Sequence, residues 1–169
     1  MASSRSEIGP TALLRVLGEG LVDFVVIGGV AVVVQASPRF TRDLDICHST
    51  TPENLERLAG VLLSLEARLR GVDADLPFKA DARTLRRAGT LTLTTNAGDL
   101  DLLAEPAGSP GYAALRRRAL VIDLDGLAVR VASLEDLIAM KQAASRPQDL
   151  IDVESLEAAR ARLRGRRAR

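Results

Sequence analysis

The sequence has few aromatic residues and almost no cysteine or histidine. Its 169 residues include three Phe, one Tyr and no Trp, together with one Cys and one His. A single Cys excludes an internal disulfide, and one Cys with one His excludes a Cys/His zinc cluster. The lack of aromatic rings argues against binding single-stranded nucleic acid by stacking. Any metal ion would therefore be held by carboxylates.

Long hydrophobic runs are also lacking. The most apolar stretch, residues 21–36, contains Asp23 and a Gly-Gly pair and is too short to span a bilayer. The first residues show no apolar segment of the kind found in signal peptides. We therefore expect a cytoplasmic protein without a membrane partner. Apolar residues make up 47% of the chain and charged residues 27%, which is typical of one globular unit with an aliphatic core.

The net charge is only +1, but the basic residues are concentrated near the C-terminal end. Residues 158–169 contain six Arg and no acidic residue. Such a segment on a near-neutral body indicates a polyanionic partner. The alternative is a solvated helix end, because cations are favoured near helix C-termini.

Helical and strand patterns alternate along the chain. We expect helices over residues 10–19, 30–35, 51–69, 133–144 and from 147 onward, and strands over residues 24–27, 44–47, 91–95, 99–103, 120–124 and 127–131. Asp125-Gly126, between the last two strands, is a hairpin signal. The interleaving predicts an α+β fold with a mixed sheet flanked by helices. We expect residues 1–132 to form the core and residues 133–169 a C-terminal helical segment with a basic tail, packed as one compact unit.

Two Asp-x-Asp sequences carry the first chemical signal. Residues i and i+2 of a strand point to the same face, so Asp43 and Asp45 would lie side by side with Leu44 turned inward. Asp99 and Asp101 repeat the pattern, and the two pairs would form one site if their strands are neighbours. Close carboxylates repel each other, and a hard divalent cation such as Mg²⁺ removes that cost. The alternative is two exposed strand faces with solvated acids.

Two further features suit phosphate binding. Gly28-Gly29 follows a buried strand and precedes a helix, where unpaired N–H groups can approach a phosphate, although a tight turn that needs positive φ is the alternative. Lys141 falls on the apolar face of its helix, where it either meets an anion or snorkels to solvent. Asp149 and Asp152 share a helix face and could orient Lys141 or Arg146.

Together these motifs resemble the DNA polymerase β-like nucleotidyltransferase superfamily. The residues that carry the resemblance are Gly28-Gly29-Val30-Ala31, Arg39-Phe40-Thr41-Arg42-Asp43-Leu44-Asp45 and Gly98-Asp99-Leu100-Asp101-Leu102-Leu103. The stretch from Ser133 to Lys141, followed by Arg146-Pro147-Gln148-Asp149-Leu150 and Asp152, resembles one branch, the AbiEii/MenT-type toxins of bacterial toxin–antitoxin systems. The resemblance covers about residues 22–157.

The resemblance implies a metal-dependent transfer of a nucleoside monophosphate from a nucleoside triphosphate (NTP), often a pyrimidine one. In this branch the acceptor is the 3′ end of tRNA, translation is blocked, and a cognate antitoxin is the protein partner. Asp43, Asp45 and a third acid, Asp101 rather than Asp99, would hold two Mg²⁺ or Mn²⁺ ions. The catalytic residues implied are Asp43, Asp45, Lys141 and Asp152, and the nucleotide- and phosphate-binding residues implied are Gly28, Gly29, Thr41, Arg42 and Arg146.

The chain departs from this pattern mainly in its length. It retains little beyond the catalytic core and two C-terminal helices, so surface Arg side chains would have to recognise the acceptor. One alternative function is nucleotidyl transfer to a small molecule or a protein, as in antibiotic adenylylation or AMPylation. Another is an inactive module that binds RNA or an antitoxin, against which the intact acids and Lys141 argue. Some toxins of this branch are silenced at a hydroxyl residue beside the Asp-x-Asp, so the resemblance also indicates a switch at Thr41.

Overall fold

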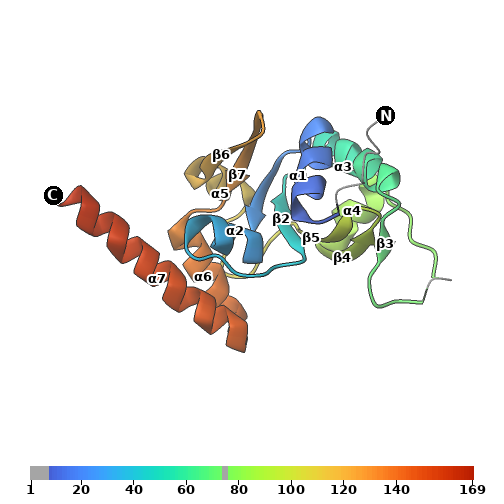
Figure 1. Ribbon diagram of the computed structural model, residues 1–169. Coiled ribbons are helices and arrows are strands. Elements are labelled where there is room, and N and C mark those ends of the chain that lie inside the picture. Colours follow the sequence, from blue (N-terminus) through green and yellow to red (C-terminus); the bar gives the residue numbers. More distant parts are fainter. Residues whose placement is uncertain (1–7, 74–75) are drawn as a thin grey trace, which may run out of the picture.

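The computed structural model describes residues 8–73 and 76–169. In this part of the chain a seven-stranded mixed sheet has the order β3-β4-β5-β2-β1-β7-β6 and is accompanied by seven helices (Figure 1). The strands are β1 (Phe24–Ile27), β2 (Leu44–His48), β3 (Arg68–Leu69), β4 (Thr90–Thr95), β5 (Gly98–Leu103), β6 (Leu120–Leu124) and β7 (Leu127–Val131). The helices are α1 (Pro10–Glu19), α2 (Gly28–Gln35), α3 (Pro52–Ser64), α4 (Ala82–Ala88), α5 (Tyr112–Arg118), α6 (Leu134–Ala144) and α7 (Pro147–Arg167). The predicted α+β class with a mixed sheet is confirmed.

Strands β1, β2 and β5 form the centre of the sheet. β1 runs antiparallel to β2, and β2 runs parallel to β5 with Leu44 opposite Leu100 and Asp45 opposite Asp101. Both leucines are fully buried, and because side chains alternate along a strand the acids lie on the other face. The two Asp-x-Asp sequences therefore lie on neighbouring strands, as the site hypothesis requires.

The turn from β1 into α2 takes place at a single glycine. All four residues of β1 are buried, and Gly28 directly after them has φ +64°. Glycine adopts this conformation without the strain that a side chain would add. α2 consequently starts at Gly28, two residues before the predicted start, and its first turn lies beside the start of β2.

The two C-terminal helices pack against each other and against α2. The Ser133 hydroxyl accepts a hydrogen bond from the Asp136 amide at the start of α6, as an N-cap residue does. Ser145, with φ +53°, ends α6, and Pro147 begins α7. α7 runs along α6 and past α2 and carries the basic segment away from the sheet (Figure 1). The predicted helices in this region are confirmed.

The prediction of one helix over residues 51–69 is wrong in its second part. α3 ends at Ser64, Glu66 has φ +51°, and the amides that follow bond back to the last turn of the helix, as in a C-terminal capping motif. Arg68–Leu69 then pair with β4 as an edge strand. Leu69 continues the helical spacing of the leucines, so periodicity alone could not show that its backbone bonds to a strand.

The short helices α4 and α5 have no counterpart among the predicted elements. Each has seven residues and one buried leucine, Leu85 and Leu115 respectively. A segment of this length is too short for a helical period to be recognised.

Over the residues that the structure describes, no helix has both the length and the apolar character needed to cross a membrane.

Candidate active site

Four acidic side chains gather where β2 and β5 run side by side. Asp45 and Asp101 are direct neighbours in the sheet, Asp99 lies on β5, and Asp43 directly precedes β2. Burial and, second, the charge of Asp101 raise the pKa of Asp45 to about 6. Burial also raises the pKa of Asp101, although Arg70 lowers it. Because these acids repel one another, a nearby cation would stabilise their charged forms.

That cation is supplied by Arg70, a residue that the sequence analysis missed. Its guanidinium lies 3.5 Å from Asp43 and 3.2 Å from Asp99 (Nη1 to Oδ2 in both cases) and hydrogen-bonds to Asp101. Arg70 directly follows β3, one residue beyond the segment that was predicted to be helical. No motif marked it, because only the pairing of β3 with β4 directs it to the acids.

The acids have the chemistry of a divalent-metal site, but they are not arranged as one. Carboxylate oxygens are the ligands that Mg²⁺ and Mn²⁺ prefer, and the raised pKa of Asp45 reflects first its burial and second the nearby charge of Asp101. Among residues 8–73 and 76–169, however, no three His, Cys, Asp or Glu side chains already form a group that could hold a metal ion. The donor set fits a metal provided that Arg70 withdraws from Asp43 and Asp101.

The two glycines leave space for functional side chains. A Cβ atom at Gly28 would collide with the carboxylate of Asp45. A Cβ atom at Gly29 would lie 2.8 Å from Thr41 Oγ1 and 2.9 Å from Arg39 Nη2. Side chains at either position would therefore displace the β2 acids or the loop that precedes them.

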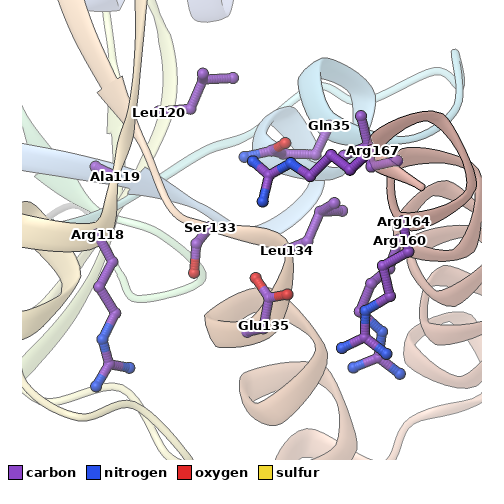
Figure 2. A pocket seen from close by; sticks show the side chains of 11 residues that line it. Gln35, Arg118, Ala119, Leu120, Ser133, Leu134, Glu135, Arg160, Arg164 and Arg167 are labelled. Carbon is purple, nitrogen blue, oxygen red and sulfur yellow. The ribbon is translucent and has the colours of Figure 1, made fainter. Parts of the chain in front are cut away.

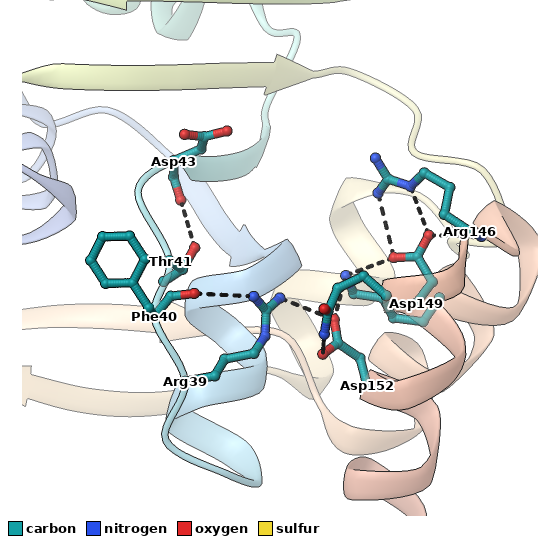
Figure 3. A network of polar contacts seen from close by, with 9 residues as sticks. Arg39, Phe40, Thr41, Asp43, Arg146, Asp149 and Asp152 are labelled. Atoms are coloured by element: carbon teal, nitrogen blue, oxygen red, sulfur yellow. Dashed lines mark hydrogen bonds and ion pairs between the residues drawn. The ribbon is translucent and has the colours of Figure 1, made fainter.

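Lys141 is buried and bound by two carboxylates of α7 (Figure 3). Its Nζ lies 2.9 Å from Asp149 Oδ1 and 2.9 Å from Asp152 Oδ2. Arg146 Nε donates to the other Asp149 oxygen at 2.7 Å. Although burial raises the pKa of Asp149, the hydrogen bonds from Arg146 and Lys141 outweigh it and lower this pKa to about 2. Lys141 therefore does not snorkel to solvent, and the two carboxylates fix its position.

The loop before β2 is tied to this network by Arg39, a second residue that the sequence analysis missed. Arg39 Nη2 lies 3.0 Å from Asp152 Oδ2, while its buried Nε has no hydrogen-bond partner among the described residues. In the same loop, Thr41 Oγ1 donates to the Asp43 carbonyl at 3.5 Å. The Arg42 guanidinium lies 5.6 Å from the centre of the exposed Phe40 ring. Figure 3 shows Arg39 directed toward Asp152 and the Phe40 ring directed away from it.

Two cavities each include one of the acids, Asp45 in one and Asp99 in the other. One, of about 200 Å³, is lined by the predicted site residues Gly28, Asp45, Lys141 and Arg146. The other, of about 530 Å³, is lined by Phe40, Thr41, Arg42 and Asp99, with part of β4. The structure thus places the predicted phosphate-binding residues in two groups, with Thr41 and Arg42 in the second. Both cavities open beside carboxylates, as the substrates of a transfer reaction require.

Comparisons with known proteins agree with this geometry. No curated protein sequence matches the chain significantly. The solution structure of the antibiotic-resistance factor ANT(2'')-Ia is similar with a TM-score of 0.50 and 17% identity, covering 92% of this chain and 89% of that one. The crystal structure of an antigenic nucleotidyltransferase-like protein from Paracoccidioides brasiliensis also has a TM-score of 0.50 and 17% identity, with coverage of 94% and 86%. Both likenesses concern the fold.

The sequence itself identifies the family. Residues 12–166 match the family described as "Nucleotidyl transferase AbiEii toxin, Type IV TA system". This match includes both Asp-x-Asp sequences, the glycine turn and the Lys141 network. The chain therefore belongs to the AbiEii nucleotidyltransferase toxin family and is a nucleotidyltransferase.

Proposed function

We propose that the protein transfers a nucleoside monophosphate from an NTP to the 3′ end of an RNA, with tRNA as the acceptor, and thereby blocks translation. The observation that carries this proposal is that each of two cavities includes one of the acids, Asp45 together with Lys141 and Arg146 in one cavity and Asp99 in the other. A transfer reaction needs a donor and an acceptor on opposite sides of the reacting phosphate. We further propose a pyrimidine nucleotide as the preferred donor, as the family resemblance implies.

In this proposal the triphosphate lies on the side of Gly28, Lys141 and Arg146. The acceptor hydroxyl oxygen attacks the α-phosphorus, the bond to the β-phosphate oxygen breaks, and pyrophosphate leaves. The hydroxyl proton passes to a carboxylate of the acidic cluster and then to water. Lys141 and Arg146 stabilise the charge that develops on pyrophosphate, and Asp149 and Asp152 hold Lys141 in place before the reaction.

Asp43, Asp45 and Asp101 would hold divalent cations, which neutralise the triphosphate and activate the attacking hydroxyl when bound. Asp99 accepts a hydrogen bond from the Thr94 hydroxyl, and we propose Asp101 as the third ligand. Its place opposite Asp45 on the neighbouring strand supports this choice.

The acceptor is tested by labelling. Purified protein is incubated with each α-³²P-labelled NTP, Mg²⁺ or Mn²⁺, and total RNA, tRNA, an aminoglycoside or a protein extract in parallel. We expect label at the 3′ end of tRNA and none with Asp45→Asn, while Glu154→Gln, on the exposed side of α7, labels like the wild type. Label on the aminoglycoside or on protein, with none on RNA, would contradict the proposed acceptor.

A further inference from the structure

A third cavity, of about 360 Å³, lies apart from the acids and contains four arginines. Arg160, Arg164 and Arg167 come from the C-terminal half of α7, and Arg118 comes from the end of α5. Leu120, Leu134 and Leu163 add apolar walls. Figure 2 shows the side chain of Arg167 directed toward Gln35. None of these residues lines the two cavities beside the acids.

The positive charge in this cavity is only partly balanced by nearby acids. Arg118 is paired with Asp136 at 2.8 Å, and Arg160 lies 3.8 Å from Glu157 at the surface. In the part of the chain that the structure describes, Arg164 and Arg167 form no ion pair. Glu135 is the acidic side chain among the lining residues. The cavity therefore has an excess of cationic groups beside apolar walls, where an anion is bound more strongly than in open solvent.

The arrangement of the arginines on α7 is not that of a helix end that is basic on all sides. Arg160, Leu163, Arg164 and Arg167 are spaced i, i+3, i+4 and i+7, so they form one stripe that faces the cavity. Arg162, Arg166 and Arg169 lie outside this stripe and do not line the cavity. A favourable helix dipole would not distinguish the two sets.

The spacing also indicates the size of the anion. At about 1.5 Å per helical residue, Arg160 and Arg167 are separated by about 10 Å along the axis of α7. One strand of double-stranded DNA presents a phosphate about every 3.4 Å along its axis, so the stripe spans about three steps from one backbone phosphate to the next. The same helical rise places the stripe about 12–22 Å beyond Asp152. A triphosphate bound at Lys141 cannot reach it, whereas the acceptor strand can extend from one to the other.

The geometry points to this cavity as the site that binds backbone phosphates of the acceptor RNA, several nucleotides away from the reacting 3′ end. This assignment rests on the proposed function for the identity of the nucleic acid. It gives the acceptor RNA a binding surface apart from the acidic cluster. Because phosphates are contacted and bases are not, binding depends on salt and only weakly on sequence.

The test compares two triple variants with the same change in charge. The cavity variant carries Arg160→Gln, Arg164→Gln and Arg167→Gln, and the control variant carries Arg162→Gln, Arg166→Gln and Arg169→Gln. Both are made in an Asp45→Asn protein, so that RNA binding is measured without transfer. Fluorescence anisotropy with labelled tRNA, at several KCl concentrations, gives the affinity and its salt slope.

We expect the cavity variant to bind tRNA at least tenfold more weakly and to lose about two to three units of salt slope, because each phosphate contact contributes about 0.7–0.9. The affinity of the control variant for tRNA should fall by less than threefold. An equal loss of tRNA affinity in the two triple variants would overturn the proposal. Unchanged tRNA binding by the cavity variant would also overturn it. Loss of binding to poly-glutamate without loss of RNA binding would also overturn it, in favour of an acidic protein partner.

The test of this cavity can fail while the proposed transfer to tRNA holds, and the reverse is also true. If the otherwise wild-type enzyme binds tRNA through this cavity but labels another acceptor, the transfer proposal fails while the cavity assignment stands. If tRNA is labelled but both variants bind it like the parent protein, the cavity assignment alone fails. Thermal melting within about 2 °C of the parent protein confirms that each variant is folded.

Discussion

Asp45 and Asp101 face each other as partners on the parallel strands β2 and β5. Burial makes the charge of Asp45 unfavourable and the nearby charge of Asp101 adds to that cost, so that the pKa of Asp45 rises to about 6. The fold therefore maintains an arrangement that is unfavourable by itself and becomes favourable with a cation. Arg70 is that cation in the structure described.

The first prediction concerns Asp45→Asn and pH. An unfolded Asp titrates near 3.8 and the folded one near 6, so the folded state binds the proton more tightly. The wild type consequently loses stability as pH rises from about 4 to above 6. Asp45→Asn should remove this loss, raising the free energy of unfolding at pH 8 by about 1–3 kcal/mol with little change at pH 4. Denaturant unfolding in EDTA at both pH values measures it, with Glu154→Gln as the control. An equal gain in the free energy of unfolding at both pH values would contradict the raised pKa of Asp45.

The second prediction concerns Arg70→Gln. The three acids lose their counter-charge, so the metal-free protein should unfold about 1 kcal/mol more easily at pH 8, since exposed ion pairs contribute modestly. Mn²⁺ should bind several-fold more tightly, because the guanidinium no longer competes for Asp43 and Asp101. Titration with Mn²⁺ monitored by electron paramagnetic resonance measures this affinity. Arg68→Gln, at an exposed position of the same edge strand, is the control. If Arg70→Gln leaves the Mn²⁺ affinity unchanged, Arg70 is not competing with the metal.

The third prediction separates the charge of Lys141 from its structural role. Lys141→Met keeps the apolar stem and should lower transfer by about 100-fold or more, as the loss of a preorganised charge does. It should also destabilise the fold by about 1–3 kcal/mol, because two buried carboxylates lose a partner. The double variant Lys141→Met/Asp149→Asn should recover part of the stability but none of the activity. Activity that returns together with stability would show that Lys141 is only structural.

How much of this site could be predicted from the sequence depends on how far apart in the sequence the contacting residues are. Asp43, Asp45, Asp99 and Asp101 follow from strand alternation and from two local motifs, and the structure brings them together. Arg70 could not be predicted, because β3 exists only through its pairing with β4. The same holds for Arg39, whose partner Asp152 is 113 residues away. Local patterns describe the elements and the motifs they carry, whereas the cations that pair with the acids are selected by tertiary packing.

The fourth prediction concerns Gly28→Ala. Its φ of +64° disfavours a side chain, and a Cβ atom would collide with the Asp45 carboxylate. We expect a loss of about 1–2 kcal/mol in stability and a fall in transfer of at least tenfold, with tRNA binding unchanged. Gly60→Ala is the matched control, because a Cβ atom there meets nothing within 4 Å and its position in α3 favours alanine. If Gly28→Ala is fully active, Asp45 can move aside and its present position is not required.

The fifth prediction concerns a negative charge introduced at Thr41. Its hydroxyl donates to the Asp43 carbonyl and lies in the cavity that also contains Arg42 and Asp99. A phosphoryl group would add a charge of about −2 beside the acidic cluster, so Thr41→Glu and phosphorylated Thr41 should lower transfer by about tenfold or more. Thr41→Ala should remain at least partly active, and Thr41→Gln, of similar size to the Glu variant but neutral, separates charge from bulk. Mn²⁺ affinity and tRNA affinity are measured alongside initial rates. Transfer by a stoichiometrically phosphorylated protein at the wild-type rate would exclude the switch. Equal losses in the Gln and Glu variants would mean that space at Thr41, rather than charge, limits the reaction.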